Sequence, residues 1–269
     1  MSTPIGNLRD ITLRALDTLG AVDEVLAEDT RVGRKLLDAH GIHAKLSPYH
    51  DHNGAERRPG LIARLVEGGR LALISDAGTP LVSDPGWKLV HEAREAGVRI
   101  IPIPGPSAML AGLVASGLAS DRFMFCGFLP PKTGPRQRAA EELKTVPATL
   151  IFYEGGSRLA ASIADLAKTL GPDRNAVVAR ELTKLFEEVR SGTLGELAAH
   201  YEEAGAPKGE IVVLVGPPGE RVTDAGDIDA ALTDAMQRLP MKAAANEVAD
   251  VFGLSKRDLY RRALQLKNG

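Results

Sequence analysis

The sequence is poor in cysteine, in aromatic residues and in net charge. A single cysteine, Cys126, excludes an intramolecular disulfide among the 269 residues, and we expect a cytoplasmic protein. Aromatic residues make up 4% of the chain, which argues against a single-strand binder built from stacking platforms. A formal net charge of −2 excludes binding of nucleic acid by bulk electrostatics, so any RNA contact must depend on local basic patches.

Several common motifs are also absent. No apolar run approaches the roughly 20 residues of a membrane-spanning helix, and the N-terminus shows no signal peptide. Neither Gly-x-Gly-x-x-Gly nor Gly-x-x-x-x-Gly-Lys-Ser/Thr occurs, which disfavours dinucleotide and P-loop phosphate binding. The closest histidines, His50 and His52, lie in a polar segment typical of a solvated loop. We therefore predict no metal site.

Short apolar runs alternate with amphipathic helical patterns over most of the chain. Apolar residues on one face predict a helix over 159–170, and Thr193 with Glu196 predicts a capping box at the start of another. The expected strands lack strict alternation, which is typical of strands covered on both faces in parallel sheets. The pattern predicts an α/β fold with parallel crossovers. The expected strands are Leu71–Ser75, Val98–Ile103, Thr149–Tyr153, Ala176–Ala179 and Ile211–Val215.

Turn-forming residues divide the chain at 127–131 and again at 216–219. We predict an N-terminal α/β domain of residues 1–119 and a second α/β domain of residues 120–218. For the remaining residues, 219–269, we predict a small helical C-terminal extension.

Glycine- and proline-rich loops follow two of the expected strands. One is Asp76-Ala77-Gly78-Thr79-Pro80 and the other is Pro104-Gly105-Pro106-Ser107-Ala108. Ligands of open α/β sheets collect at the carboxyl ends of strands, where glycine allows close backbone approach and proline stiffens the loop. Tight strand-to-helix turns capped by Asp or Ser explain either loop, taken alone, equally well.

Two further segments place acid and base at expected strand ends. They are Glu28-Asp29-Thr30-Arg31 and Arg180-Glu181-Leu182-Thr183-Lys184. Either could bind a polar ligand, but paired surface charge is the simpler explanation of each segment by itself.

Taken together and in order, six segments resemble one family. The set is similar to the bacterial 16S ribosomal RNA cytidine-2′-O-methyltransferases, a branch of the tetrapyrrole-methylase superfamily. The resemblance extends from Ser2 to about Leu266, and six ordered motifs make chance agreement improbable. The segments are Thr3–Leu8, Glu28–Arg31, Ser75–Pro80, Pro104–Ala108, Gly127–Pro130 and Arg180–Lys184.

The resemblance implies the two-domain tetrapyrrole-methylase fold, with parallel and mixed sheets and a homodimer. It also implies that S-adenosylmethionine binds between the two α/β domains. The cofactor-binding residues that it implies are Pro4, Gly6, Asp76, Gly78, Thr79, Pro80, Pro104, Gly105, Ser107, Ala108, Tyr153, Glu154, Arg180, Gly209 and Glu210.

The sequence departs from the family pattern in two places. Relatives carry an apolar first strand before the loop that begins at Thr3, so we expect either an upstream start, which we favour, or another segment in that position. Relatives also carry Ser-Pro-His between Glu154 and Arg158, where this chain has Gly155-Gly156-Ser157. We therefore assign no catalytic histidine there.

Methyl transfer from S-adenosylmethionine requires in-line alignment and removal of the hydroxyl proton. The candidate bases are Glu28, Asp29, Glu181 and Lys184, which stand at strand ends within the family motifs. A lysine base must be neutral, so burial would have to lower the pKa of Lys184.

Basic residues in three regions are the candidate contacts to 16S rRNA within the 30S subunit. In the tail, Ala249, Gly253 and Leu259 fall at helix-turn-helix spacing, with Ser255 expected to cap the second helix over Asp258. Two alternatives stay open: Arg31 pairs with Glu28 or Asp29, and the tail is a packed helical hairpin with a solvated basic face. The candidate contacts are Arg31, Lys132, Arg136, Arg138, Lys256, Arg257 and Arg261.

Two rival functions remain at this point. One keeps the fold but changes the substrate, as in a corrin or sirohaem C-methyltransferase or a diphthine synthase. The other is a nucleic-acid-binding regulator whose tail binds duplex DNA in a salt-dependent way and which transfers no methyl group.

Overall fold

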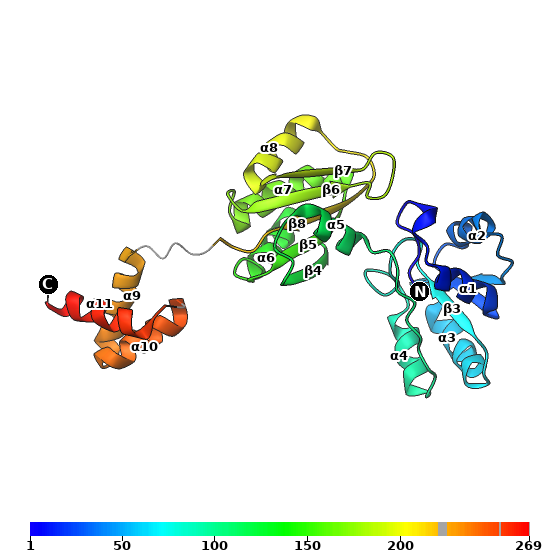
Figure 1. The fold of residues 1–269 in the computed structure, drawn as a ribbon, viewed down its shortest axis with the longest axis horizontal. Helices are drawn as coiled ribbons and strands as arrows, with labels where there is room; N and C mark the ends of the chain where they lie inside the picture. The colour runs from blue at the N-terminus through cyan, green and yellow to red at the C-terminus, as the bar shows by residue number, and fades with distance from the viewer. Residues whose placement is uncertain (220–224, 253, 269) are drawn as a thin grey trace. The chain divides into compact units, whose positions relative to one another are not determined.

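The chain forms two compact units, Met1–Pro218 and Gly219–Gly269 (Figure 1). The computed structural model describes residues 1–219, 225–252 and 254–268. The first unit contains two β-sheets, and the second is helical. The finer domain boundary at residue 119 stays a prediction. No helix in the described ranges is long and apolar enough to cross a membrane.

The first sheet is parallel, with strand order β2-β1-β3. Its strands are β1 (Glu24–Ala27), β2 (Leu46–Pro48) and β3 (Leu71–Ile74). All four residues of the central strand β1 are buried, and Leu19, Leu37 and Ile74 pack in the same core. The helical elements around this sheet are the 3-10 helix η1 (Leu8–Asp10), α1 (Leu13–Ala21), α2 (Thr30–Ala39), α3 (Asp51–Val66) and α4 (Trp87–Glu95).

The predicted strand Val98–Ile103 is wrong, because the structure has no strand there. The Ser2 amide donates to the Ile103 carbonyl at 3.1 Å, and the terminal amine of Met1 donates to the Leu73 carbonyl at 2.8 Å. Met1 and Ser2 thus form hydrogen bonds with β3 and with the segment that ends at Ile103. One hydrogen bond on each side does not make the repeated ladder of a sheet.

The second sheet is mixed, with strand order β4-β5-β8-β6-β7. The β4–β5 pair is parallel, whereas the β5–β8, β8–β6 and β6–β7 pairs are antiparallel. The expected combination of parallel and mixed sheets is therefore confirmed, and strands buried on both faces occur in the mixed sheet as well because such burial does not depend on strand direction. The strands are β4 (Phe123–Phe128), β5 (Thr149–Gly155), β6 (Asn175–Arg180), β7 (Glu188–Thr193) and β8 (Glu210–Val215).

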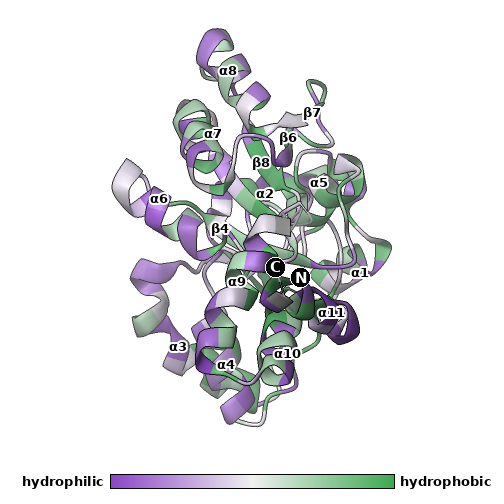
Figure 2. Cartoon of the chain, turned by 90° about the vertical axis from the view of Figure 1, so that its left-hand side faces the viewer, coloured by the Kyte–Doolittle hydropathy of each residue, from purple (hydrophilic) through white to green (hydrophobic). Residues whose placement is uncertain are grey.

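Helices cover both faces of this sheet. Three of them, α6 (Thr133–Glu142), α7 (Gly156–Leu170) and α8 (Leu194–Ala204), pack on one face. Helix α5 (Ala108–Ser116) packs on the other, against residues such as Val212. In Figure 2 the strand β8 and helix α5 are mainly hydrophobic, whereas α6, α7 and α8 carry hydrophilic residues as well. The predicted helix over 159–170 is confirmed as the greater part of α7.

Two predicted helix caps are confirmed. Thr193 and Glu196 form a reciprocal capping box at the start of α8, in which each side chain accepts the other's backbone amide. In the second unit, the hydroxyl of Ser255 accepts the amide of Asp258 at 3.4 Å, near the start of α11.

The second unit has a hydrophobic core of its own. Its helices are α9 (Ala225–Arg238), α10 (Met241–Phe252) and α11 (Lys256–Asn268). Ala249 of α10 and Leu259 of α11 are both buried in this core, as the helix-turn-helix spacing predicts, and Gly253 lies outside the described residues.

Candidate functional site

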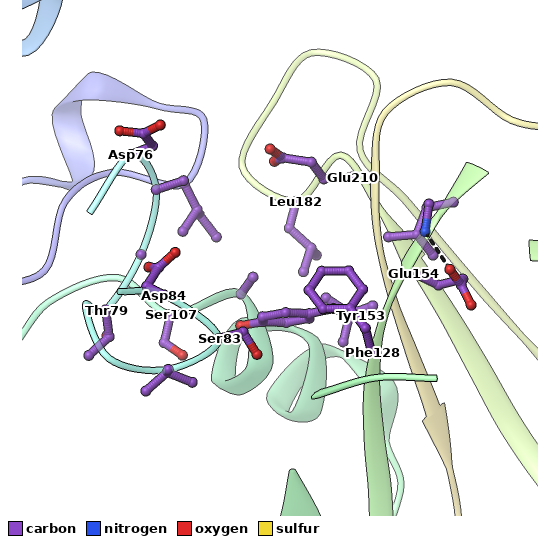
Figure 3. A pocket seen from close by; sticks show the side chains of 18 of the residues that line it. Asp76, Thr79, Ser83, Asp84, Ser107, Phe128, Tyr153, Glu154, Leu182 and Glu210 are labelled. Atoms are coloured by element: carbon purple, nitrogen blue, oxygen red, sulfur yellow. Dashed lines mark hydrogen bonds between the residues drawn. The ribbon is translucent and has the colours of Figure 1, made fainter. Parts of the chain in front are cut away.

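A cavity of about 410 Å³ lies in the first unit. Its walls come from the loop after β3, the start of α5, the ends of β4 and β5, the loop after β6 and the beginning of β8. These are strand ends and helix starts, the places where α/β folds bind ligands. Figure 3 shows the side chains that converge on it.

The cavity brings together nine of the fifteen expected cofactor-binding residues. They come from segments distant in sequence, which the fold makes neighbours: Asp76, Gly78, Thr79, Ser107, Ala108, Tyr153, Glu154, Gly209 and Glu210.

Six expected residues are outside the lining. Arg180 instead pairs with Glu188 at 2.9 Å. The backbones of Gly6 and Gly105 lie against the side chains of Lys184 and Ser2, where a Cβ would clash. The six are Pro4, Gly6, Pro80, Pro104, Gly105 and Arg180.

Glu154 lines the cavity, but its carboxylate bonds within the protein (Figure 3). The side chain is 2% exposed and pairs with Arg158 at 2.7 Å. It also accepts the Ser162 hydroxyl at 2.6 Å and the Gly155 amide at 2.8 Å. A ligand therefore meets the backbone of this residue rather than its charge.

Sequence reasoning missed several lining residues, among them Ile5, Asp84, Phe128 and Leu182. Asp84 stands eight residues after Asp76, in a second turn-forming segment, and that proximity was the available signal. Phe128 belongs to a segment that marks a break between domains and resembles a family motif, but neither signal assigned it to the cofactor site.

Hydrogen bonds hold the loop after β3 in shape. Thr3 and Gly78 exchange two backbone bonds, with N–O distances of 2.9 and 3.0 Å. The hydroxyl of Thr79 lies 3.0 Å from that of Ser2 and donates to the Pro106 carbonyl at 3.3 Å. This loop is therefore fixed to both the N-terminal segment and the second glycine-rich loop.

The same loop continues through strained backbone. Leu81 and Ser83 adopt φ angles of 73° and 59°, in the left-handed region that non-glycine residues rarely occupy. Strain of this kind persists where the surrounding structure enforces it, and it clusters at functional sites.

The cavity is acidic. Burial, together with the neighbouring carboxylates of Glu28 and Asp76, raises the pKa of Asp84 to about 6. The Asp76 carboxylate accepts the amide of Asp29 at 3.0 Å, which fixes the segment after β1 beside the loop after β3. A ligand that carries positive charge suits these surroundings.

The first two candidate bases differ in their electrostatics. Burial raises the pKa of Glu28, and the carboxylates of Asp76 and Asp51 raise it further. Asp29 caps α2 and pairs with Arg31 at 2.5 Å, and hydrogen bonds from Arg31 hold its pKa at about 2. Arg31 is thus engaged in the ion pair that the alternative interpretation predicted.

The other two candidates form an ion pair. Lys184 Nζ lies 2.8 Å from Glu181 and 3.0 Å from Glu210. Burial alone would lower the pKa of Lys184, but these two carboxylates raise it above its ordinary value. The structure therefore favours a protonated Lys184 over the neutral form that a lysine base requires.

One candidate RNA contact is also wrong. Arg136 is 3% exposed and its guanidinium lies 2.6 Å from Asp165, with further bonds to the Pro130–Pro131 carbonyls. Lys132 and Arg138 on either side of it are exposed, and neither forms an ion pair within the described part of the chain.

The candidate RNA contacts in the C-terminal tail differ in whether they form ion pairs within the protein. Lys256 pairs with Asp250 at 3.0 Å, and Arg261 lies 3.7 Å from Asp258. Arg257 is exposed and has no ion pair among the described residues. Over the same described ranges, no cluster of His, Cys, Asp or Glu could hold a metal ion.

Comparison with known families agrees with this geometry. Residues 2–198 match the family model described as Tetrapyrrole (Corrin/Porphyrin) Methylases, and residues 222–267 match the RsmI C-terminal HTH domain. The chain belongs to the tetrapyrrole methylase family, and it is accordingly a methyltransferase that uses a methyl donor.

Within that family, two similar curated proteins carry the same name. The chain is 56% identical over 268 residues to Ribosomal RNA small subunit methyltransferase I of Mesorhizobium japonicum, covering 100% of this chain and 91% of that protein. It is 46% identical over 265 residues to the protein of that name from Escherichia coli O157:H7, covering 98% and 93%.

Solved structures of more distant relatives share the fold. Diphthine synthase matches with a TM-score of 0.62 at 18% identity, covering 80% of this chain and 88% of that one. The cobalt precorrin-4 methyltransferase CbiF matches with a TM-score of 0.61 at 18% identity, covering 80% and 92%. At this level of identity the match shows the fold alone.

Proposed function

We propose that this protein transfers a methyl group from S-adenosylmethionine to the ribose 2′-hydroxyl of a cytidine in 16S rRNA. The observation that carries the proposal is the 56% identity over the whole chain to a Ribosomal RNA small subunit methyltransferase I. The rival substrates of the fold rest on structures at 18% identity, which are much weaker support.

The cavity fits S-adenosylmethionine in its chemistry. That cofactor carries a sulfonium and an ammonium cation beside an adenine ring, and the cavity offers the carboxylates of Asp76 and Asp84. Apolar walls at Ile5, Leu182 and Val212 suit the adenine. Gly78 has a φ of 78°, a conformation that suits glycine, and without a Cβ its backbone lets a ligand approach this turn closely.

When bound, S-adenosylmethionine supplies an electrophilic methyl group. The protein's part is to orient the ribose and exclude water, and alignment of this kind lowers a barrier by about 7–11 kcal/mol at best. The hydrogen-bonded loop at Thr3, Gly78 and Thr79 supplies a rigid wall for this purpose.

Glu28 is the candidate that best suits the acceptance of the ribose proton. Its pKa is raised, whereas those of Asp29 and Glu181 are lowered, and a carboxylate with a lowered pKa is a weaker base. Glu28→Gln should slow single-turnover methyl transfer by roughly 10²- to 10⁴-fold without weakening cofactor binding. Equal slowing by Glu181→Gln would contradict this assignment.

RNA contacts are proposed for the exposed cations of two helical regions. Lys132 directly precedes α6, Arg138 lies within α6, and Arg257 and Arg261 lie on α11. Contacts of this kind neutralise phosphates. Each alanine variant should therefore reduce the slope of log K for subunit binding against log salt concentration by about one unit.

We also propose a homodimer. Helix α5 is apolar all round, with Leu110 45% and Val114 81% exposed. The loop between β6 and β7 exposes Leu185 and Phe186, at 89% and 69%. Apolar side chains exposed in this number mark a surface for another protein, here a second copy. Val114→Glu should produce a monomer in analytical ultracentrifugation.

The direct test is tritium transfer from labelled S-adenosylmethionine to 30S subunits from a strain that lacks the modification. Nuclease mapping then identifies the labelled nucleotide. Label on one cytidine ribose of 16S rRNA is the expected result. Cofactor binding without transfer would point to another substrate of the fold, and binding of duplex DNA without either would favour a regulator.

A further inference from the structure

Strand β4 contains an irregularity beside the cavity. In its parallel pairing with β5, Phe125 lies opposite Ile151 but Gly127 lies opposite Phe152, so Cys126 is an extra residue in the strand. Gly127 adopts a φ of 65°, a conformation that suits glycine. Such bulges occur next to active sites, where they redirect a side chain.

The bulge decides where Phe128 points. In a regular strand, residues 125 and 128 would face opposite sides of the sheet. Here both rings contact Tyr153, with centroid distances of 4.8 Å for Phe125 and 5.7 Å for Phe128. The extra residue therefore brings Phe128 onto the face that carries Tyr153 and the cavity (Figure 3).

Phe128 lines the cavity yet stays 58% exposed. The apolar walls deeper in the cavity are buried: Ile5, Leu182 and Val212 are 6%, 8% and 4% exposed. An aromatic ring held edge to face by its neighbour, and open to solvent on the side of a binding cavity, is a surface on which a flat ligand stacks.

We propose that Phe128 is the platform on which an unpaired base of the RNA substrate stacks, so that its ribose is held at the cavity. This inference rests on the proposed function. Proteins recognise unstacked bases of RNA by stacking them on aromatic side chains. The exposed cations Lys132 and Arg138 follow Phe128 within ten residues and supply phosphate contacts near such a base.

The adenine of the methyl donor is the other flat ligand that could meet this ring. We assign the ring to the RNA because a small cofactor gains more from the buried walls at Ile5 and Val212. A macromolecule, in contrast, reaches the exposed side of the cavity first.

The test compares four variants of the full-length protein. Phe128→Ala and Phe128→Leu remove the aromatic face, Phe128→Tyr retains it, and Phe123→Ala is the matched control on the same strand. Phe123 is 43% exposed and lies outside the cavity lining. The measurements are kcat/KM for 30S subunits, the Kd for S-adenosylmethionine by calorimetry, and the oligomeric state.

We expect Phe128→Ala and Phe128→Leu to lower kcat/KM about 5- to 100-fold, the range for loss of one base–aromatic stack. Phe128→Tyr and Phe123→Ala should stay within about 2-fold of the wild type. The Kd for S-adenosylmethionine should be unchanged in all four, which also shows that the variants are folded.

Three results would overturn the assignment while the wild type still methylates subunits. These are an unchanged kcat/KM in Phe128→Ala, a loss of cofactor affinity that accounts for the whole effect, or dissociation of a dimer. Absence of methyl transfer by the wild type would instead remove the proposed function, and this inference with it.

Discussion

The ammonium of Lys184 lies 2.8 Å from the carboxylate of Glu181. The same oxygen of Glu181 accepts the backbone amide of Glu210 at 3.1 Å, so the pair joins the loop after β6 to the start of β8. The aliphatic stem of Lys184 also covers the backbone of Gly6, where a Cβ would lie 2.4 Å from Cγ of Lys184. This pair is a structural clamp between three segments of the first unit.

The first prediction concerns the chemistry of Lys184. Because its pKa is raised, the side chain is protonated at neutral pH and cannot accept the ribose proton. Lys184→Met keeps the stem and removes the charge. Single-turnover methyl transfer should fall less than about 10-fold, below the 10²–10⁴ of a lost general base. A larger loss, together with a changed pH profile, would show that the lysine takes part in proton transfer.

The second prediction is a pH dependence of cofactor binding. The pKa of Asp84 is raised to about 6, so its carboxyl group is mostly neutral at pH 5 and ionised at pH 8. A cationic ligand prefers the ionised form, so affinity should rise with pH. Calorimetry with S-adenosylmethionine should show roughly 10-fold weaker binding at pH 5 than at pH 8. Asp84→Asn should bind weakly at both values, and a pH-dependent response in that variant would assign the effect to another group.

The third prediction compares two arginines that are two residues apart in the chain. Arg136 and Asp165 form a buried pair, with side chains 3% and 11% exposed. Arg136→Ala leaves a buried charge unpaired, and the free energy of unfolding should fall by about 3–5 kcal/mol. Arg138→Ala changes an exposed side chain, so stability should stay within about 0.5 kcal/mol while subunit binding weakens. Urea denaturation measures the first effect, and equal stability of the two variants would contradict it.

The fourth prediction concerns Glu24, at the start of β1. Burial would raise its pKa, but hydrogen bonds from Ser47, Arg64 and Lys45 outweigh burial and hold the pKa at about 2. A lowered folded-state pKa contributes stability above the unfolded value, near 4.5, and that contribution is lost as the pH falls toward 2. With a side chain only 2% exposed, the contribution is about 2–3 kcal/mol.

Denaturation followed by the fluorescence of Trp87, the one tryptophan of the chain, reports on the unit that contains Glu24. Glu24→Gln should lower stability at pH 7, and the difference from the wild type should shrink between pH 4.5 and pH 2. A difference that is constant over this range would mean that Glu24 acts through packing rather than charge.

The regular elements were largely predictable from the sequence. The runs at Thr149–Tyr153, Ala176–Ala179 and Ile211–Val215 are strands because β-branched and apolar residues fill a sheet covered on both faces. The failure at Val98–Ile103 has a physical cause outside that segment. An extended run becomes a strand only where a neighbouring backbone forms repeated hydrogen bonds with it. Here Ser2 forms one hydrogen bond, with Ile103.

The details of the site were less predictable. Glycine-rich loops indicated the cavity, because backbone freedom at a strand end is visible in sequence. The pKa of Asp84 depends on carboxylates 56 and 8 residues away, at Glu28 and Asp76, and the burial of Arg136 depends on Asp165. The placement of Phe128 depends on a register shift, which no local pattern reveals.

The helical unit owes its cohesion to its own core, which is composed mostly of alanine. Alanine buries little apolar area, and a segment of this size is near the lower limit for autonomous folding. Warming would therefore melt this unit ahead of the larger one. Under the proposed function, in which the cations of this unit contact the RNA, warming would then weaken substrate binding before it slowed methyl transfer.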